Sequence, residues 1–307
     1  QHERAPFHAC GVAATGSNQT LTIVGLIHGI ACSRGSQCFY VLLISSLSLE
    51  PADGFSHLQH RAYSLGPMLQ SVLMEHTDAA YAEQLHASTF NPYSQYCFMQ
   101  EDGNLVWHIS ALTDEAASRL LDPVSKIDSF TLRNLDKTIS VVKKTRETVS
   151  VAFFLDLLKK DPSSSFRIRF ATPTAFKSKG QYVIMPDVRL IFQNLLMRYN
   201  QAYAGDKEID SETVDYIAEH VRVSSYSLRS CYFPRTMGKA DKIPAFVGSL
   251  TLHAAGPQSL RGLVAMLLSF GEASGIGVKT SMGMGGVQLL QNASKSNPAE
   301  QGGQIGR

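Results

Sequence analysis

The stretch Gly271-Glu-Ala-Ser-Gly-Ile-Gly-Val-Lys-Thr-Ser-Met-Gly-Met-Gly-Gly286 is the most informative part of this 307-residue chain. Six of its sixteen residues are glycine, and Lys279-Thr280 lies in its middle. Glycines let a loop expose backbone N–H groups and let an anionic backbone approach closely. A periodic apolar pattern over 257–271 predicts a helix before the loop, and Val287–Leu290 predicts a short strand after it.

Two familiar nucleotide-binding loops do not fit this stretch. A phosphate loop of the NTPase type needs glycine directly before its lysine and a helix after it, but Val278 precedes Lys279 and a strand follows. A dinucleotide-binding fingerprint needs a third glycine where Thr280 stands. Two interpretations stay open from the residues alone: a turn without a ligand, or a loop that contacts phosphate or RNA beside Lys279.

Outward from this loop, both halves of the chain show the same order of elements. The N-terminal half predicts a strand, two helices, a hairpin, a helix and weaker strands, at 38–49, 55–74, 79–86, 93–110, 113–121 and beyond 127. The C-terminal half predicts a strand, two helices, a pair of strands, a helix and a last strand, at 166–170, 187–203, 211–220, 221–253, 257–271 and 287–290. This is the order of a ferredoxin-like unit.

We therefore predict an α+β protein with two tandem ferredoxin-like, RRM-like domains and a C-terminal glycine-rich loop. The expected divisions are a non-domain leader at 1–37, an N-terminal domain at 38–140, a C-terminal domain at 141–292 and a loose tail at 293–307. The leader is set apart because it is rich in small residues and nearly free of charge.

Composition and charge exclude several classes of protein. Apolar residues make up 44% and charged residues 18%, as in a globular chain. The best apolar run, Leu21–Ala31, is shorter than the ~20 residues that span a bilayer, so no membrane partner is expected. Residues 1–150 carry 10 basic and 14 acidic side chains, and residues 151–307 carry 18 and 12. The basic C-terminal half permits a polyanionic partner, and a solvated charged surface is the alternative.

The cysteines and histidines suggest neither a disulfide framework nor a metal site. The five cysteines are odd in number and form no Cys-x-x-Cys pair. The ten histidines show no metal-ligand spacing. We expect no cofactor and no metal, and the cysteine usage favours a cytoplasmic location.

Three strings, in the expected order, resemble one family. Gly275–Val287 is similar to the C-terminal signature of the CRISPR-associated endoribonucleases that process repeat RNA, members of the RAMP superfamily. Phe170–Lys177, with Gly180 and Pro186-Asp187 after it, resembles the start of their C-terminal domain. Ala79–His86, ahead of Asn91-Pro-Tyr-Ser, resembles their N-terminal helix and catalytic histidine. The resemblance covers about residues 38–291.

The resemblance implies metal-independent cleavage of CRISPR precursor RNA within its repeats. The 2′-hydroxyl beside the scissile phosphate would attack, leaving a 5′-hydroxyl and a 2′,3′-cyclic phosphate. That chemistry needs a proton acceptor, a proton donor and cations or N–H groups for the developing charge. His86 is the candidate general acid or base, because histidine titrates near neutral pH. A purely structural histidine is the alternative.

The helper residues of the family are not all present. The family's supporting tyrosine and lysine correspond to Ser71 and Asn91 here, and neither can do the same work. Tyr81, Asn91 and Lys177 are the candidate helpers. A non-catalytic RAMP protein that only binds RNA inside an effector complex is therefore the alternative function, and a nucleotide-dependent enzyme that uses the glycine loop is a weaker third.

RNA binding is expected at the glycine loop and at a basic connection between strands. In the loop, the candidates are Gly275, Gly277, Lys279 and Thr280. In the connection, they are Arg229, Arg235, Lys239 and Lys242, and a solvated hairpin is the alternative there. The implied partners are CRISPR repeat RNA or crRNA, with effector-complex subunits and a second copy of the chain as further candidates.

Overall fold

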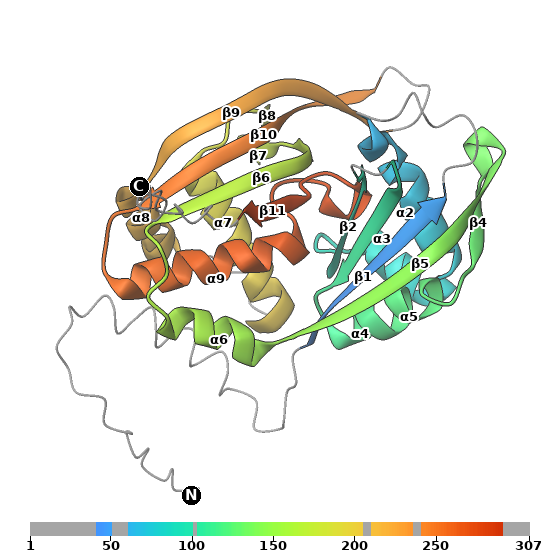
Figure 1. Cartoon of the computed structure of the whole chain (residues 1–307), viewed down its shortest axis with the longest axis horizontal. Coiled ribbons are helices and arrows are strands. Elements are labelled where there is room, and N and C mark those ends of the chain that lie inside the picture. The colour runs from blue at the N-terminus through green and yellow to red at the C-terminus, as the bar shows by residue number, and fades with distance from the viewer. Residues whose placement is uncertain (1–40, 51–60, 101–102, 205–209, 236–240, 291–307) are drawn as a thin grey trace, which may run out of the picture. The chain divides into compact units, whose positions relative to one another are not determined.

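Two antiparallel sheets and the helices that cover them build the computed structural model (Figure 1). It describes residues 41–50, 61–100, 103–204, 210–235 and 241–290, which belong to one compact unit. The leader and tail expected at 1–37 and 293–307 lie outside the described residues. No helix in these described ranges is both long enough and apolar enough to cross a bilayer.

The first sheet has five strands in the order β2-β3-β1-β5-β4, and every neighbouring pair is antiparallel. Its strands are β1 Val41–Glu50, β2 Tyr93–Met99, β3 Leu105–Ala111, β4 Ser129–Leu132 and β5 Lys137–Ser150. On β1, Leu47 and Leu49 are fully buried, whereas the alternate residues are only partly covered. This period of two puts one face of the sheet against helices.

Helices from the first half of the chain cover that buried face. They are a 3-10 turn at Ala62–Leu65, α2 Gly66–Glu75, α3 Ala79–Ala87, α4 Asp114–Ala116, a π-helical turn at Ala117–Leu121 and α5 Asp122–Val124. Pro67 lies in the first turn of α2, where its missing N–H is harmless, so it begins the helix and does not kink it. Leu69, Leu73 and Leu120 join the core under β1.

The second sheet has four strands in the order β11-β6-β10-β9, again antiparallel throughout. Its strands are β6 Ser165–Thr174, β9 Val221–Pro234, β10 Lys242–Ala254 and β11 Val287–Leu290. A small separate hairpin follows β6, with β7 Phe176–Ser178 and β8 Gln181–Val183. The helices are α6 Val151–Lys159, α7 Val188–Tyr199 with a π-helical turn to Ala204, α8 Ser211–His220 and α9 Gln258–Ser274.

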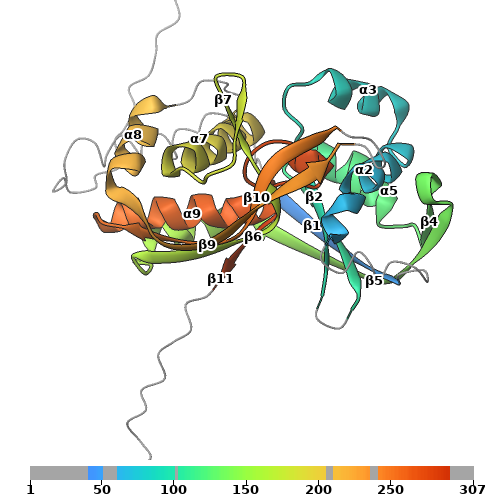
Figure 2. The ribbon, with the colours of Figure 1, turned by 90° about the horizontal axis from the view of Figure 1, so that it is seen from above.

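In the part of the chain that the structure describes, helices cover only one face of this second sheet. Figure 2 shows α7, α8 and α9 on the same side of it. On β6, Phe166, Ile168 and Phe170 are buried toward that side, and the alternating Arg167 and Arg169 are exposed on the other. The alternation of apolar and basic residues therefore decides which face of the sheet stays open.

The chain passes from the first half to the second at the end of β5. This strand pairs with β1 as far as Ser150, and α6 begins at Val151 and contacts the start of α9. There Gly262 of α9 lies so close to the Leu158 carbonyl that an added Cβ would come within 2.7 Å of its oxygen. The division expected between residues 140 and 141 falls inside β5.

One buried glutamine forms hydrogen bonds to both halves of the chain. Gln95 of β2 is fully buried, and its Nε2 donates to the carbonyl of Gly66 at 2.9 Å and to that of Ser281 at 3.2 Å. Its Oε1 accepts from Trp107 Nε1 at 2.9 Å. The amide therefore joins the sheet, the start of α2 and the glycine loop, here defined as residues 275–286.

Replacing Gln95 should destabilise the whole unit. Gln95→Leu would leave the buried indole N–H of Trp107 without its acceptor and would remove the hydrogen bonds to the Gly66 and Ser281 carbonyls, at a cost of about 2–4 kcal/mol of unfolding free energy. Gln95→Glu should cost at least as much, because its carboxylate would face both carbonyls. Urea unfolding measures this, with Gln84→Leu on the exposed side of α3 as the control. Stabilities of both Gln95 variants equal to that of the control would contradict the bridge.

Candidate active site

A cleft of about 530 Å³ lies where the two halves meet. Its walls are the inner turns of α2, the end of α3 with residues 88–91 after it, the last turns of α7, and residues 277–282 of the glycine loop. His86, Asn91, Lys279 and Thr280 all line this cleft. The fold thus brings the expected histidine and the expected loop, which are far apart in the chain, to one place.

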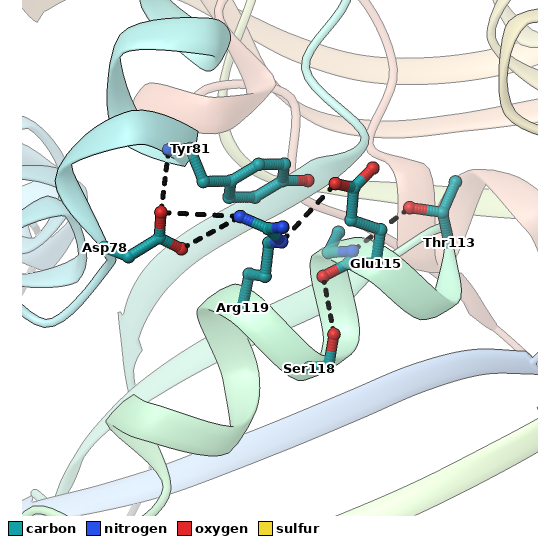
Figure 3. Close-up of polar contacts among 7 residues, drawn as sticks. Asp78, Tyr81, Thr113, Glu115, Ser118 and Arg119 are labelled. Carbon is teal, nitrogen blue, oxygen red and sulfur yellow. Dashed lines mark hydrogen bonds and ion pairs between the residues drawn. The ribbon is translucent and has the colours of Figure 1, made fainter.

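The helix that carries His86 is fixed at its beginning. Asp78 caps α3 by accepting a hydrogen bond from the Tyr81 N–H at 3.0 Å. Arg119 forms ion pairs with Asp78 at 3.3 Å and with Glu115 at 3.4 Å, and its guanidinium lies 5.2 Å from the centre of the Tyr81 ring (Figure 3). These contacts tie the start of α3 to the helical segment at 114–124.

His86 and Tyr81 point in different directions. They are five residues apart, which on an α-helix places them on different faces. His86 is exposed and lines the cleft, whereas Tyr81 is buried and is not among the lining residues. Burial first, and then the charge of Glu115, raises the pKa of Tyr81 to about 12. Of the expected helpers, the cleft therefore contains Asn91 but not Tyr81.

Internal hydrogen bonds use most of the backbone N–H groups at the start of the glycine loop. Ile276 N–H donates to the Gly285 carbonyl, and Val278 N–H donates to the Ala175 carbonyl. Gly277 has a φ of 95°, and its N–H donates to the Asn194 side chain of α7 at 2.8 Å. These N–H groups hold the loop in place and are not turned toward the cleft for an anion.

Lys279 gives this loop an exposed, positively charged side chain at the cleft. Lys279 is exposed and has left-handed backbone angles, with φ 58° and ψ 34°. That conformation is uncommon for a residue other than glycine and marks a position worth a functional explanation. Met282 N–H donates to the Lys279 carbonyl at 2.9 Å and helps to hold the turn. Gly275 is buried behind it, and Thr280 is 3% exposed.

Lys177 lies beside the cleft and not in it. It lines an adjacent cleft of about 420 Å³ that shares Asn194, Gly277 and Val278 with the first one. The loop therefore separates Lys177 from His86 along the same surface.

The basic connection expected between two strands is largely part of the strands themselves. Arg229 lies inside β9, and Lys242 is the first residue of β10. Arg235 forms an ion pair with Asp241 at 3.4 Å and donates from Nη2 to the hydroxyl of Tyr182 at 2.8 Å. Lys239 lies outside the described residues. None of the described three lines the cleft with His86.

Arginines gather on the open face of the second sheet. Arg167 and Arg169 of β6 are opposite Thr251 and Ser249 of β10, and Arg229 of β9 is opposite Val247. Thr251 and Ser249 are two residues apart on β10, so Arg167 and Arg169 point away from the helices. Arg229 is an exposed residue of β9 opposite Val247, where the pairing of β10 with β6 shifts register. Within the described residues, none of the three forms an ion pair.

One residue of the cleft was missed by sequence reasoning. Arg198 of α7 lines the cleft but is only 8% exposed. Its Nη2 donates to the Tyr93 carbonyl at 3.5 Å, its guanidinium lies 5.6 Å from the centre of the Phe90 ring, and its Nε has no partner. Burial lowers its pKa to about 10. The signal in the sequence was an arginine in the apolar stripe of Ile191 and Leu195.

A second cleft contains a histidine of a different kind. This cleft of about 380 Å³ lies between the two sheets and contains His108 and Glu272. The serines Ser46 and Ser110 are hydrogen-bonded to the two ring nitrogens of His108, each at 3.2 Å. Burial lowers the pKa of His108 to about 4, so it is neutral near pH 7. His86, at the exposed end of its helix, is better placed for proton transfer.

The described residues contain no group of three or more His, Cys, Asp or Glu side chains that could hold a metal ion. The cations that line the cleft come from Arg198 and Lys279, with His86 as the titratable group. Such a set suits a phosphodiester.

Comparison with known proteins shows the family. A model of the CRISPR-associated endoribonuclease Cas6 matches residues 168–287. A Cas6 endoribonuclease of Streptococcus thermophilus is 36% identical over 236 residues, which are 76% of this chain and 95% of the relative. One from Mycobacterium tuberculosis is 37% identical over 232 residues, 75% of this chain and 73% of the relative. The chain belongs to the Cas6 family of CRISPR-associated endoribonucleases.

Solved structures support the same fold. A Cas6 product complex superposes with a TM-score of 0.64 at 22% identity, covering 82% of this chain and 100% of that one. A Cas6 from Thermus thermophilus gives a TM-score of 0.56 at 22% identity, covering 83% of this chain and 100% of that one.

The close approach of the glycine loop to the β6–β7 segment can be tested with one methyl group. A Cβ on Gly277 would lie 2.4 Å from the Ala175 carbonyl oxygen, whereas Gly180 has a similar φ of 80° and open space around it. Gly180→Ala should cost about 1 kcal/mol of unfolding free energy for its backbone angle alone. Gly277→Ala should cost about 2 kcal/mol more, because the loop must move. Equal losses in urea unfolding would show that the contact does not matter.

Proposed function

We propose that this protein cleaves CRISPR precursor RNA within its repeats, by attack of the RNA's own 2′-hydroxyl and without a metal ion. The observation that carries the proposal is the shared cleft of His86 and Lys279, in a chain that belongs to the Cas6 family. The products would be a 5′-hydroxyl and a 2′,3′-cyclic phosphate.

The proposed roles follow from position and chemistry. His86 exchanges the proton of the 2′-hydroxyl or of the leaving 5′-oxygen, because its imidazole is exposed in the cleft at the end of α3. Lys279 reaches the same cleft with a positive charge that can balance the developing charge on phosphate. Asn91 can donate a hydrogen bond there. Tyr81 is assigned to packing under Arg119 and not to the reaction.

The strand orders support the finer description of the fold. In each half, the fourth strand of the unit, then the first, third and second lie side by side: β5-β1-β3-β2 and β11-β6-β10-β9. We propose that these halves are tandem ferredoxin-like domains, with β4 as an added edge strand and with the boundary after Ser150. A cytoplasmic location stays a prediction.

The open, basic face of the second sheet is the proposed path for the rest of the repeat. Arg167 and Arg169 can contact phosphates there regardless of sequence. Membership of a larger complex is a further proposal: a structure entitled a Cas6-RT-Cas1–Cas2 complex matches 84% of this chain at 11% identity, with a TM-score of 0.55.

A cleavage assay on labelled CRISPR repeat RNA in EDTA tests this function. Wild-type protein should cut the repeat once, and a single 2′-deoxy nucleotide 5′ of the cut should stop the reaction. His86→Ala should lower the single-turnover rate about 100-fold or more, because proton transfer contributes that much. Binding of the deoxy RNA by this variant should stay within about threefold of wild type, since imidazole adds little affinity.

His76→Ala is the matched control, because His76 ends α2 outside the cleft and its ring bonds only the Val72 carbonyl. It should cut like wild type. If wild-type protein binds the repeat and does not cut it, the non-catalytic RNA-binding alternative replaces the proposal. The support for that alternative is Ser71, which stands where the family has its supporting tyrosine. Its hydroxyl donates to the Pro67 carbonyl of its own helix, and it is not among the cleft's lining residues.

A further inference from the structure

Arg198 is a buried cation without a counter-ion. It is 8% exposed, and among the described residues no carboxylate forms an ion pair with it. The nine described ion pairs all have at least one partner more exposed than Arg198. Among the described residues, Arg198 is therefore the charged side chain that is buried without an ion pair.

The partners that Arg198 has do not neutralise it. The Tyr93 carbonyl accepts one long hydrogen bond at 3.5 Å, and the Phe90 ring offers a face 5.6 Å away. Nε has no partner at all. Burying an unpaired charge is costly by several kcal/mol, and an apolar residue of similar volume is commonly better for stability alone. The position therefore demands a reason other than folding.

The surroundings of Arg198 indicate which kind of group could neutralise its charge. It lines the same cleft as His86 and Lys279, so a group that enters this cleft meets two cations and one histidine. A guanidinium offers a planar fork of N–H donors that fits two phosphate oxygens at once. The carbonyl of Tyr93 and the ring of Phe90 hold this fork from the protein side.

We propose that Arg198 binds the phosphate of the RNA at the cut site and that this phosphate is the missing counter-ion. This inference rests on the proposed function and adds to it the group that holds the reacting phosphate beside His86. The second domain, through α7, then contributes to the cleft a residue that acts on the substrate, while the first domain contributes the histidine.

Two consequences separate this role from a structural one. Without RNA, Arg198→Met should be as stable as wild type or more stable, because the unpaired buried charge is gone. With RNA, the same variant should bind more weakly, and the loss should depend on the negative charge of one phosphate only. A structural arginine would show the reverse: a less stable protein and no dependence on any single phosphate.

The test uses repeat RNA with a 2′-deoxy nucleotide that blocks cutting and either a normal phosphate or an uncharged methylphosphonate at the mapped cut site. Wild-type protein should bind the phosphate RNA about tenfold or more tightly than the methylphosphonate RNA, the size of a lost charged hydrogen bond. Arg198→Met should lose most of this preference, and the remainder is what Lys279 in the same cleft contributes. Urea unfolding of each variant without RNA gives its stability.

Arg189→Met is the matched control, since Arg189 lies on the same helix but pairs with Asp215 at the surface. It should keep the full tenfold preference. Arg198→Lys retains the positive charge without the guanidinium's paired N–H donors, so it should keep part of the preference for phosphate RNA over methylphosphonate RNA. This variant replaces Arg198→Met in the test if Arg198→Met does not fold. An equal preference in wild type and Arg198→Met, or none in wild type, would overturn the assignment of Arg198.

The proposed function and this inference can fail separately. Cutting by wild type with no phosphate preference at the cut site would uphold the function and reject Arg198. If wild type binds without cutting, the function fails, and the methylphosphonate is then moved along the repeat. One position whose tenfold effect is mostly lost in Arg198→Met would keep Arg198 as a phosphate-binding residue, and no such position would reject it.

Discussion

The amide of Gln95 is the contact on which the rest of the site depends. An amide is suited to this place because it donates two hydrogen bonds and accepts others, and Gln95 uses both abilities while fully buried. Its neighbours on β2 extend the connection: Ser94 donates to the Ala273 carbonyl of α9, and the Tyr93 carbonyl accepts from Arg198 of α7. The start of this one strand therefore joins both halves of the chain around the cleft.

Two residues that line the cleft adopt arrangements that are unfavourable for folding. Arg198 is charged and buried without an ion pair, and Lys279 adopts a left-handed backbone. Neither feature helps folding, and such exceptions tend to cluster where a protein binds or reacts. Gln95 bonds the Ser281 carbonyl, two residues after Lys279, and lies two residues after Tyr93, whose carbonyl accepts from Arg198.

Sequence patterns predicted the elements that carry strong periodicity. The helix of His86, the hairpin at 93–111 and the order helix, glycine loop, strand near the C-terminus are all confirmed. The lengths of β5 and β9 were less predictable, because both strands have mostly exposed residues and lack an apolar alternation. That is why Arg229 and Lys242 were expected in a connection and lie in strands.

For the candidate site, the sequence could predict single residues but not how distant segments meet. The resemblance led to His86 and the glycine loop, and the structure places both at one cleft. The sequence could not show that the N–H groups of Gly277 and Val278 are used internally, because their partners on α7 and after β6 are far away in the chain. Arg198 was hidden for the same reason: its cleft is made by residues from both halves of the chain.

The central claim is that α3 and the glycine loop face the same phosphate of the bound RNA. Photo-crosslinking measures this most directly, with 4-thiouridine placed next to the cut in a repeat RNA that carries the blocking 2′-deoxy nucleotide. Mass spectrometry of the crosslinked peptides should find the nucleotide attached both within 86–91 and within 277–282. Crosslinks to only one of these segments, or only to the open face of the second sheet, would contradict the account.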